Sequence, residues 1–137
     1  MKKNILKGIG AVLAGLVFIG ITHSVTDAIL EAIGVLPSGH LNVEPGLILF
    51  VILYRAIFSI AGCFLTAKLA PRNPMTHALI LGAIGTIASA IGAIVTANMN
   101  IAPAWYGWSL VVMALPLAWL AGKFYLAKNE VRINTTI

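Results

Sequence analysis

The stretch from residue 46 to residue 70, "GLILFVILYRAIFSIAGCFLTAKLA", decides the fold. It contains two charged residues, Arg55 in its middle and Lys68 near its end. It is longer than the roughly 20 apolar residues that an α-helix needs to cross the hydrocarbon core of a bilayer. Pro45 precedes it and suits the first turn of a helix, where a backbone N–H would have no partner. The stretch therefore predicts a transmembrane helix with one arginine inside the membrane.

The rest of the chain has the same character. Its 137 residues are 60% hydrophobic and 9% charged, whereas a soluble domain has about 25% charged residues. Too few polar side chains are present to cover a surface that faces water. The net charge of +5 is therefore better explained by orientation in a membrane than by nucleic acid. We expect the lipid bilayer as a partner and no nucleic acid.

Three further segments resemble the first in composition, and each of the last three predicted spans has a proline at its start. The predicted spans are residues 8–36, 46–70, 75–97 and 104–126, followed by a short polar tail, 129–137, expected to be frayed and cytoplasmic. Short loops between them predict an all-α fold, a bundle of four transmembrane helices with antiparallel neighbours. A cleaved signal peptide is the alternative for the first span. No A-x-A-like site follows it, so we expect an uncleaved anchor.

Basic residues predict how the bundle is oriented. The nine Lys and Arg residues of the chain, with the exception of Arg55, all lie near one end of the predicted spans. They are Lys2, Lys3, Lys7, Lys68, Arg72, Lys123, Lys128 and Arg132. The loops "PSGHLNVEP" (37–45) and "NMNIAP" (98–103) contain no Lys or Arg. By the positive-inside rule, both termini are expected in the cytoplasm.

The first predicted span carries a polar face. In "GITHSVTDAILEAIGV" (20–35), His23, Asp27 and Glu31 recur every four residues, which places them on one side of a helix. Such a face is not expected to point at lipid. Asp27 and Arg55 each lie nine residues from the outer ends of their spans, a depth of about 13 Å. Equal depth on neighbouring helices predicts a buried Asp27–Arg55 ion pair.

Two interpretations of this cluster remain open. In the first, the ion pair locks two helices together in a non-catalytic structural or accessory protein. In the second, the cluster is an outward-facing pocket of a small transporter, or of a protein that binds a ligand or protons. The candidate pocket residues are His23, Asp27, Glu31 and Arg55, with His40, Glu44 and Tyr54 at the rim. They do not match a recognised zinc spacing, so we expect no metal and no cofactor.

The third predicted span is rich in small residues. Gly82, Gly85, Ser89 and Ala93 are candidates for close helix packing, either within the chain or in a homo-oligomer. The sequence contains no GxSxG, HExxH, CxxC or phosphate-loop motif. We therefore expect no enzymatic activity, and the sequence indicates no particular partner protein.

Three stretches carry a resemblance to a known group of proteins. They are "VTDAILEAIGVLP" (25–37), "YRAIFSIAGCFLTAKLAPRNPMTHALILGAIG" (54–85) and "AWYGWSLVVMALPLAWLAGK" (104–123). The chain resembles an uncharacterised family of small four-span bacterial integral membrane proteins with no assigned function. The resemblance implies a multi-pass protein of the bacterial inner membrane and implies no activity.

The small multidrug-resistance transporters offer a second comparison, because they too have four short spans and a membrane carboxylate. In those transporters the carboxylate lies deep in the first span and the charge bias is weak. Here the bias is strong and the acidic residues lie toward the outer end. The resemblance therefore ends at the number of spans.

Overall fold

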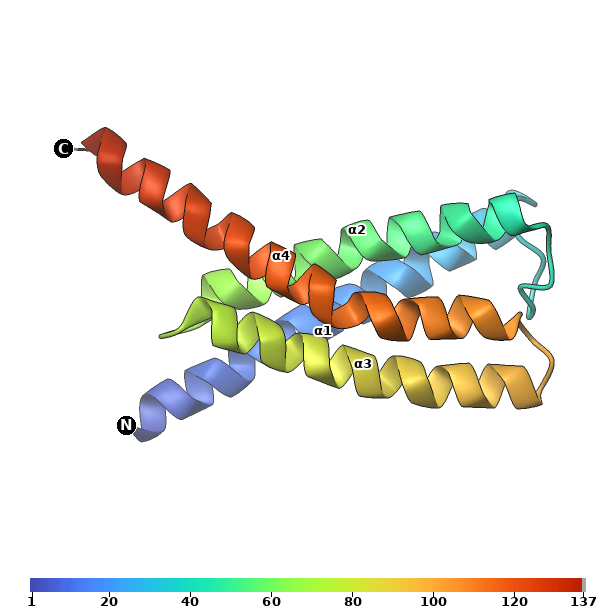
Figure 1. Cartoon of the computed structure of the whole chain (residues 1–137), viewed down its shortest axis with the longest axis horizontal. Helices are drawn as coiled ribbons and strands as arrows, with labels where there is room; N and C mark the ends of the chain where they lie inside the picture. Colours follow the sequence, from blue (N-terminus) through green and yellow to red (C-terminus); the bar gives the residue numbers. More distant parts are fainter. Residues whose placement is uncertain (137) are drawn as a thin grey trace.

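The computed structural model describes residues 1–136, and over this range it consists of four α-helices (Figure 1). They are α1 (Lys2–Ala32), α2 (Pro45–Leu69), α3 (Pro74–Asn98) and α4 (Ala104–Thr136). Each helix is long and apolar enough to cross a membrane, which indicates a multi-pass membrane protein. Both termini and the α2–α3 connection lie at one end of the long axis, and the other two connections lie at the opposite end (Figure 1).

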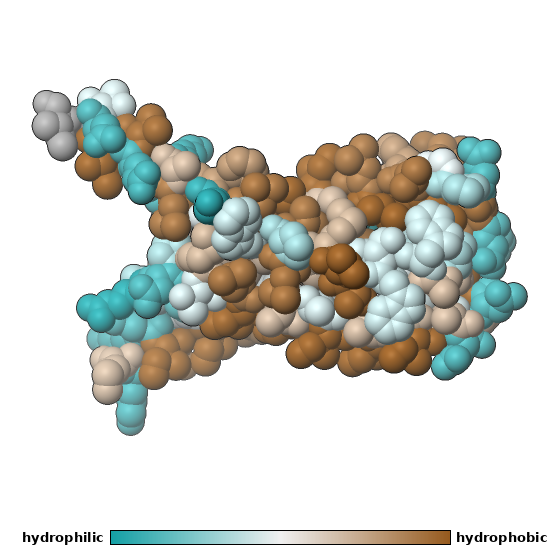
Figure 2. Space-filling view, viewed as in Figure 1, coloured by the Kyte–Doolittle hydropathy of each residue, from teal (hydrophilic) through white to brown (hydrophobic). Residues whose placement is uncertain are grey.

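The surface agrees with this assignment. Figure 2 shows a broad apolar band in the middle of the molecule and hydrophilic residues concentrated at its two ends. Large apolar side chains such as Val17, Leu53, Ile87 and Val112 are more than half exposed. A protein in water would bury most of these side chains, whereas in a bilayer they contact acyl chains at no cost.

Two helix ends differ from the sequence prediction. The first helix ends at Ala32, short of the predicted Leu36, because Gly34 adopts a left-handed φ of 77° and the chain turns back there. The N–H groups of Val35 and Leu36 donate to the carbonyl of Leu30 at 2.9 and 3.1 Å. At the other terminus α4 continues to Thr136. The prediction of a frayed tail is therefore wrong for residues 129–136, which hold no proline or glycine to stop a helix, and residue 137 lies outside the described range.

The helices α3 and α4 pack closely through small residues. A Cβ atom on Gly82 would lie 2.5 Å from the Cβ of Ala118, and one on Gly107 would lie 2.8 Å from the Cα of Ala93. Gly82 and Ala93 thus serve packing within the chain, as one of the two sequence predictions has it. Pro116 lies inside α4, where it removes one backbone hydrogen bond, and α4 diverges from α3 toward its C-terminal end (Figure 1).

The helices α1 and α2 make a second close contact. The Thr66 hydroxyl donates to the Ala11 carbonyl at 3.1 Å, and Thr66 is fully buried. One turn away Gly15 faces Gly62, and a Cβ atom on Gly15 would lie 2.7 Å from the Gly62 carbonyl oxygen. A buried apolar cluster that includes Cys63 and Leu81 surrounds this contact, and a second cluster around Ile48, Val51 and Tyr106 lies nearer the α1–α2 loop.

The contact at Gly15 generates a prediction for stability. Gly15→Ala should destabilise the protein by about 1–3 kcal/mol, because the new methyl group forces α1 away from α2. Gly10→Ala on the same helix is the matched control, since a Cβ there meets nothing within 4 Å. That control should be neutral or stabilising by up to about 1 kcal/mol, the difference in helix propensity. Thermal unfolding of both variants in detergent measures the difference, and equal stability of the two would contradict the packing described.

Candidate functional site

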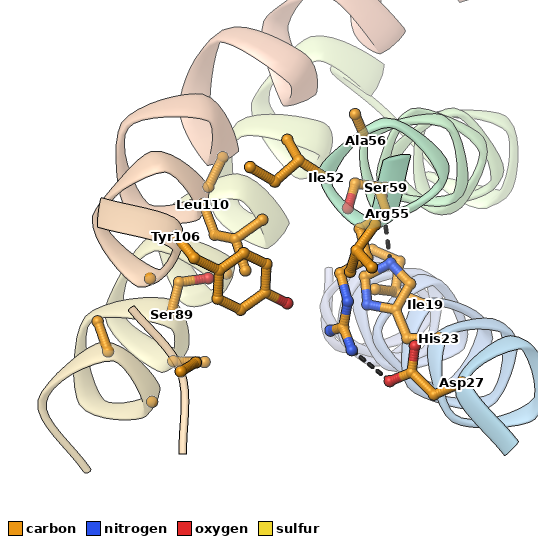
Figure 3. A pocket seen from close by; sticks show the side chains of 18 of the residues that line it. Ile19, His23, Asp27, Ile52, Arg55, Ala56, Ser59, Ser89, Tyr106 and Leu110 are labelled. Atoms are coloured by element: carbon orange, nitrogen blue, oxygen red, sulfur yellow. Dashed lines mark hydrogen bonds and ion pairs between the residues drawn. The ribbon is translucent and has the colours of Figure 1, made fainter. Parts of the chain in front are cut away.

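A cavity of about 560 Å³ lies between the four helices. At one end it is lined by Pro37, Gly39 and His40 of the α1–α2 loop, and it extends inward as far as Cys63 and Leu81. Its volume is within the roughly 300–1,000 Å³ that is typical of small-molecule sites. Most of its lining is apolar, with a polar group on the α1–α2 side (Figure 3).

The polar side chains on this side of the cavity form a set of contacts between α1 and α2. Arg55 Nη2 forms an ion pair with Asp27 Oδ2, and the Tyr54 hydroxyl donates to Asp27 Oδ1. His23 Nε2 lies 3.2 Å from the Arg55 carbonyl oxygen. A carbonyl only accepts, so His23 is the donor there and its Nε2 carries the proton. Three contacts thus connect the two helices within two helical turns.

The ion pair that equal depth predicts is therefore present, but the prediction that it is buried is wrong. The side chains of Arg55 and Asp27 are 23% and 29% exposed. Both line the cavity (Figure 3). The charges lie on the wall of an open space and are not covered by packed side chains, which reduces the cost of removing them from water.

Glycines on α1 and α3 explain why the space stays open. Gly20 of α1 and Gly85 and Gly92 of α3 line the cavity. A Cβ atom on Gly20 or Gly92 would meet nothing within 4 Å, and one on Gly85 would only approach the Ala114 Cβ at 3.9 Å. No backbone requires a glycine at these three positions, since all three lie within regular helix. Their effect is to leave volume unfilled in front of Arg55 and Asp27.

Arg55 keeps donor capacity beyond its pair with Asp27. Its Nε is buried and has no hydrogen-bond partner among residues 1–136. The guanidinium points from α2 into the cavity, and the Tyr106 ring points toward it from α4 on the far side (Figure 3). Tyr106 is within electrostatic range of both Arg55 and Asp27. Within the described part of the chain, the hydroxyls of Tyr106, Ser59 and Ser89 make no hydrogen bond, and all three residues line the cavity.

The remaining candidates divide into two groups. Glu31 and His40 line the outer part of the cavity and are exposed. Glu44 does not line it and instead occupies the position just before α2. Tyr54, expected at the rim, lies deeper and is only 8% exposed, since its hydroxyl is held by Asp27.

Sequence reasoning missed two cavity residues of the α4 side and one role on α3. Tyr106 lies in "AWYGW", which is typical of an interfacial aromatic belt, and Leu110 follows it one turn later on the same wall. Ser89 and Gly85 were predicted to pack helices together, but in the structure they line the cavity. The sequence does place Gly85 and Ser89 on the same face of α3 as Gly92, and side chains this small cannot fill the space in front of them.

The site offers hydrogen-bond chemistry and no metal centre. Among the described residues, no group of three or more His, Cys, Asp or Glu side chains is placed to hold a metal ion. The polar groups that line the cavity include the N–H donors of Arg55, the carboxylates of Asp27 and Glu31, and the hydroxyls of Ser59, Ser89 and Tyr106. This arrangement can bind and orient a polar group within apolar walls.

No family model, no curated protein and no solved structure matches the chain. The resemblance to the four-span bacterial family therefore stays a prediction.

The hydrogen bond between Tyr54 and Asp27 can be tested by removing a single atom, the hydroxyl oxygen of Tyr54. Tyr54→Phe should destabilise the protein by about 1.5–3 kcal/mol, the usual worth of a hydrogen bond to a charged group. Tyr125→Phe is a matched control, because Tyr125 packs edge-on against Phe64 and its hydroxyl donates to no group within residues 1–136. Chemical unfolding in detergent measures both variants. An equal effect of the two substitutions would show that the Tyr54 hydroxyl does not hold Asp27.

Proposed function

We propose that the protein binds a small molecule in the membrane, in the cavity between its four helices, as a small transporter or a receptor-like binding protein. The observation that carries the proposal is the position of the Asp27–Arg55 pair. The pair lies on the wall of a cavity of ligand size rather than under packed side chains. A pair kept only for stability would be expected to be covered or replaced by apolar residues of similar volume.

The structural interpretation remains the second candidate, and one observation favours it. Asp27, Tyr54, Arg55 and His23 form a continuous set of contacts between α1 and α2. Such a set fixes the register of two helices without any ligand. It does not, however, require the three glycines that keep the cavity open.

The orientation is part of the proposal. We propose an antiparallel bundle with both termini in the cytoplasm, in the inner membrane of a bacterium as the resembling family implies. Eight basic residues lie toward the end that holds both termini and the α2–α3 connection, and the positive-inside rule makes that end cytoplasmic. The cavity then opens toward the outside, next to the loop that contains His40.

Accessibility of the cavity separates the two candidates. Ser59 lines the cavity one turn deeper than Arg55. In a Cys63→Ala background, Ser59→Cys should react with methyl methanethiosulfonate, a small neutral thiol reagent, added from the outside. Adding Gly92→Leu should slow the reaction at least tenfold, whereas Gly10→Leu should leave the rate unchanged. Mass spectrometry of the labelled protein gives the rates.

Leu53→Cys supplies the baseline for this experiment. Leu53 is 59% exposed on α2 and does not line the cavity, so a thiol there faces lipid and should stay unreactive. If Ser59→Cys is as unreactive as Leu53→Cys, or if Gly92→Leu has no effect on its rate, the cavity is closed to ligands and the structural role is favoured.

A further inference from the structure

From the cavity we infer the chemical class of its ligand, an inference that rests on the proposed function. We propose that the site binds a neutral lipophilic molecule with a hydrogen-bond-accepting carbonyl oxygen, which enters from the bilayer between α1 and α3. The carbonyl group accepts hydrogen bonds from Arg55 and Tyr106, and the apolar part of the molecule lies along the apolar walls.

The cavity has an opening at its side, between α1 and α3. Leu16 and Gly20 of α1 and Ala88 and Gly92 of α3 all line the cavity and are also exposed. Residues that do both mark the edge of an opening, here between α1 and α3. The two helices touch instead near their other ends, where Gly8 meets His77 and Gly15 meets Leu81. They therefore separate toward the outer end and leave a lateral window.

This window lies at the depth of the hydrocarbon core of the bilayer. Gly20 is twelve residues from the end of α1 and Ala88 is ten residues from the end of α3. At 1.5 Å per residue these positions are about 18 and about 15 Å from the helix ends. Both fall within the roughly 30 Å hydrocarbon core. A molecule that passes through the window comes from among the acyl chains and is therefore largely apolar.

The hydrogen-bonding groups at the centre of the cavity indicate which ligand group fits there. At the centre of the cavity, Asp27 already accepts from both Arg55 and Tyr54. Arg55 carries only N–H groups, which donate and cannot accept. Its guanidinium points toward the Tyr106 hydroxyl (Figure 3). The ligand group that fits between these two side chains is an acceptor.

The charges of the cavity lining favour a neutral ligand. Among the Lys, Arg, Asp and Glu side chains, the cavity lining holds one arginine, Arg55, and two carboxylates, Asp27 and Glu31. The Asp27–Arg55 pair is itself neutral, so an added anion would carry an uncompensated charge into the membrane, and Glu31 would repel it. A cation would be attracted to Glu31 at the outer mouth, but the Arg55 guanidinium deeper in the cavity offers it no acceptor. A neutral acceptor such as a ketone, ester or quinone carbonyl avoids both costs.

A series of ligands with matched chains tests this assignment. The full-length protein in phosphatidylcholine nanodiscs is incubated with radiolabelled 2-tridecanone, and bound label is read by scintillation proximity. Unlabelled 2-tridecanone should displace the label, whereas tridecane, dodecanoate and dodecylammonium should compete at least tenfold more weakly. Dioleoylglycerol and a decyl-substituted benzoquinone, as further competitors, distinguish an ester lipid from a ring ketone, and displacement by either supports the proposal.

Three variants of the protein complete the test. Tyr106→Phe removes one donor and should weaken ketone binding by about 3–10-fold. Gly92→Leu should abolish saturable binding, because its side chain occupies the cavity. Gly10→Leu should bind like the unmodified protein, since Gly10 faces open space and does not line the cavity.

The outcomes that overturn the inference are specific. If tridecane competes as well as the ketone, the donors play no part. If dodecanoate or dodecylammonium competes better and Gly92→Leu still abolishes binding, the head-group class is wrong and the proposed function stands. If the ketone shows no saturable binding although Ser59→Cys is reactive, the inference fails while the cavity remains a site. An unreactive Ser59→Cys would remove both proposals.

Discussion

An arginine in the middle of a membrane helix needs a partner, and this requirement organises the molecule. An unpaired arginine at mid-span costs roughly 2.5–3.5 kcal/mol on insertion scales. Arg55 meets the requirement through Asp27 on the neighbouring helix. The same aspartate accepts from Tyr54, and His23 donates to the backbone of Arg55. Together with the Thr66–Ala11 hydrogen bond and the close approach of Gly15 to Gly62, this pair sets the position of α1 against α2 and hence the α1–α2 wall of the cavity.

Small residues have two effects along α3. Gly82 and Ala93 let the backbones of α3 and α4 approach closely, and both also border the cavity. At Gly85 a Cβ would come no closer than 3.9 Å to Ala114, and at Gly92 it would meet nothing within 4 Å, so there the same small size leaves volume unfilled. Bringing helices together by small residues is the usual way to pack in lipid. The charged pair faces an open volume because, apart from Leu81, the α3 residues that line the cavity are small.

Much of the fold could be predicted from the sequence. Hydropathy and length give the four helices, and proline gives the starts of α2 and α3. The partner of Arg55 could be predicted because depth along a helix is fixed by residue number. Helix ends were harder to predict, because Gly34 stops α1 through its backbone conformation and no residue stops α4 before Thr136.

The cavity could not be predicted, because it depends on how far α1 and α3 separate. Periodicity places residues on a face but does not say whether a second helix covers that face. Sequence reasoning therefore assumed that Asp27 and Arg55 are covered, and it assigned Gly85 and Ser89 to packing. Tyr106 reaches the site from a helix that begins far along the chain, and its neighbours resemble any interfacial aromatic belt.

A double-mutant cycle on Asp27→Ala and Arg55→Ala, measured as the free energy of unfolding in detergent, tests the central claim most directly. The account predicts that each single substitution is strongly destabilising and that the double substitution costs less than their sum. The difference, the coupling energy, should be about 1.5–3 kcal/mol, as for a hydrogen bond between charged groups. Additive effects, within about 0.5 kcal/mol, would contradict the claim that this pair holds α1 against α2.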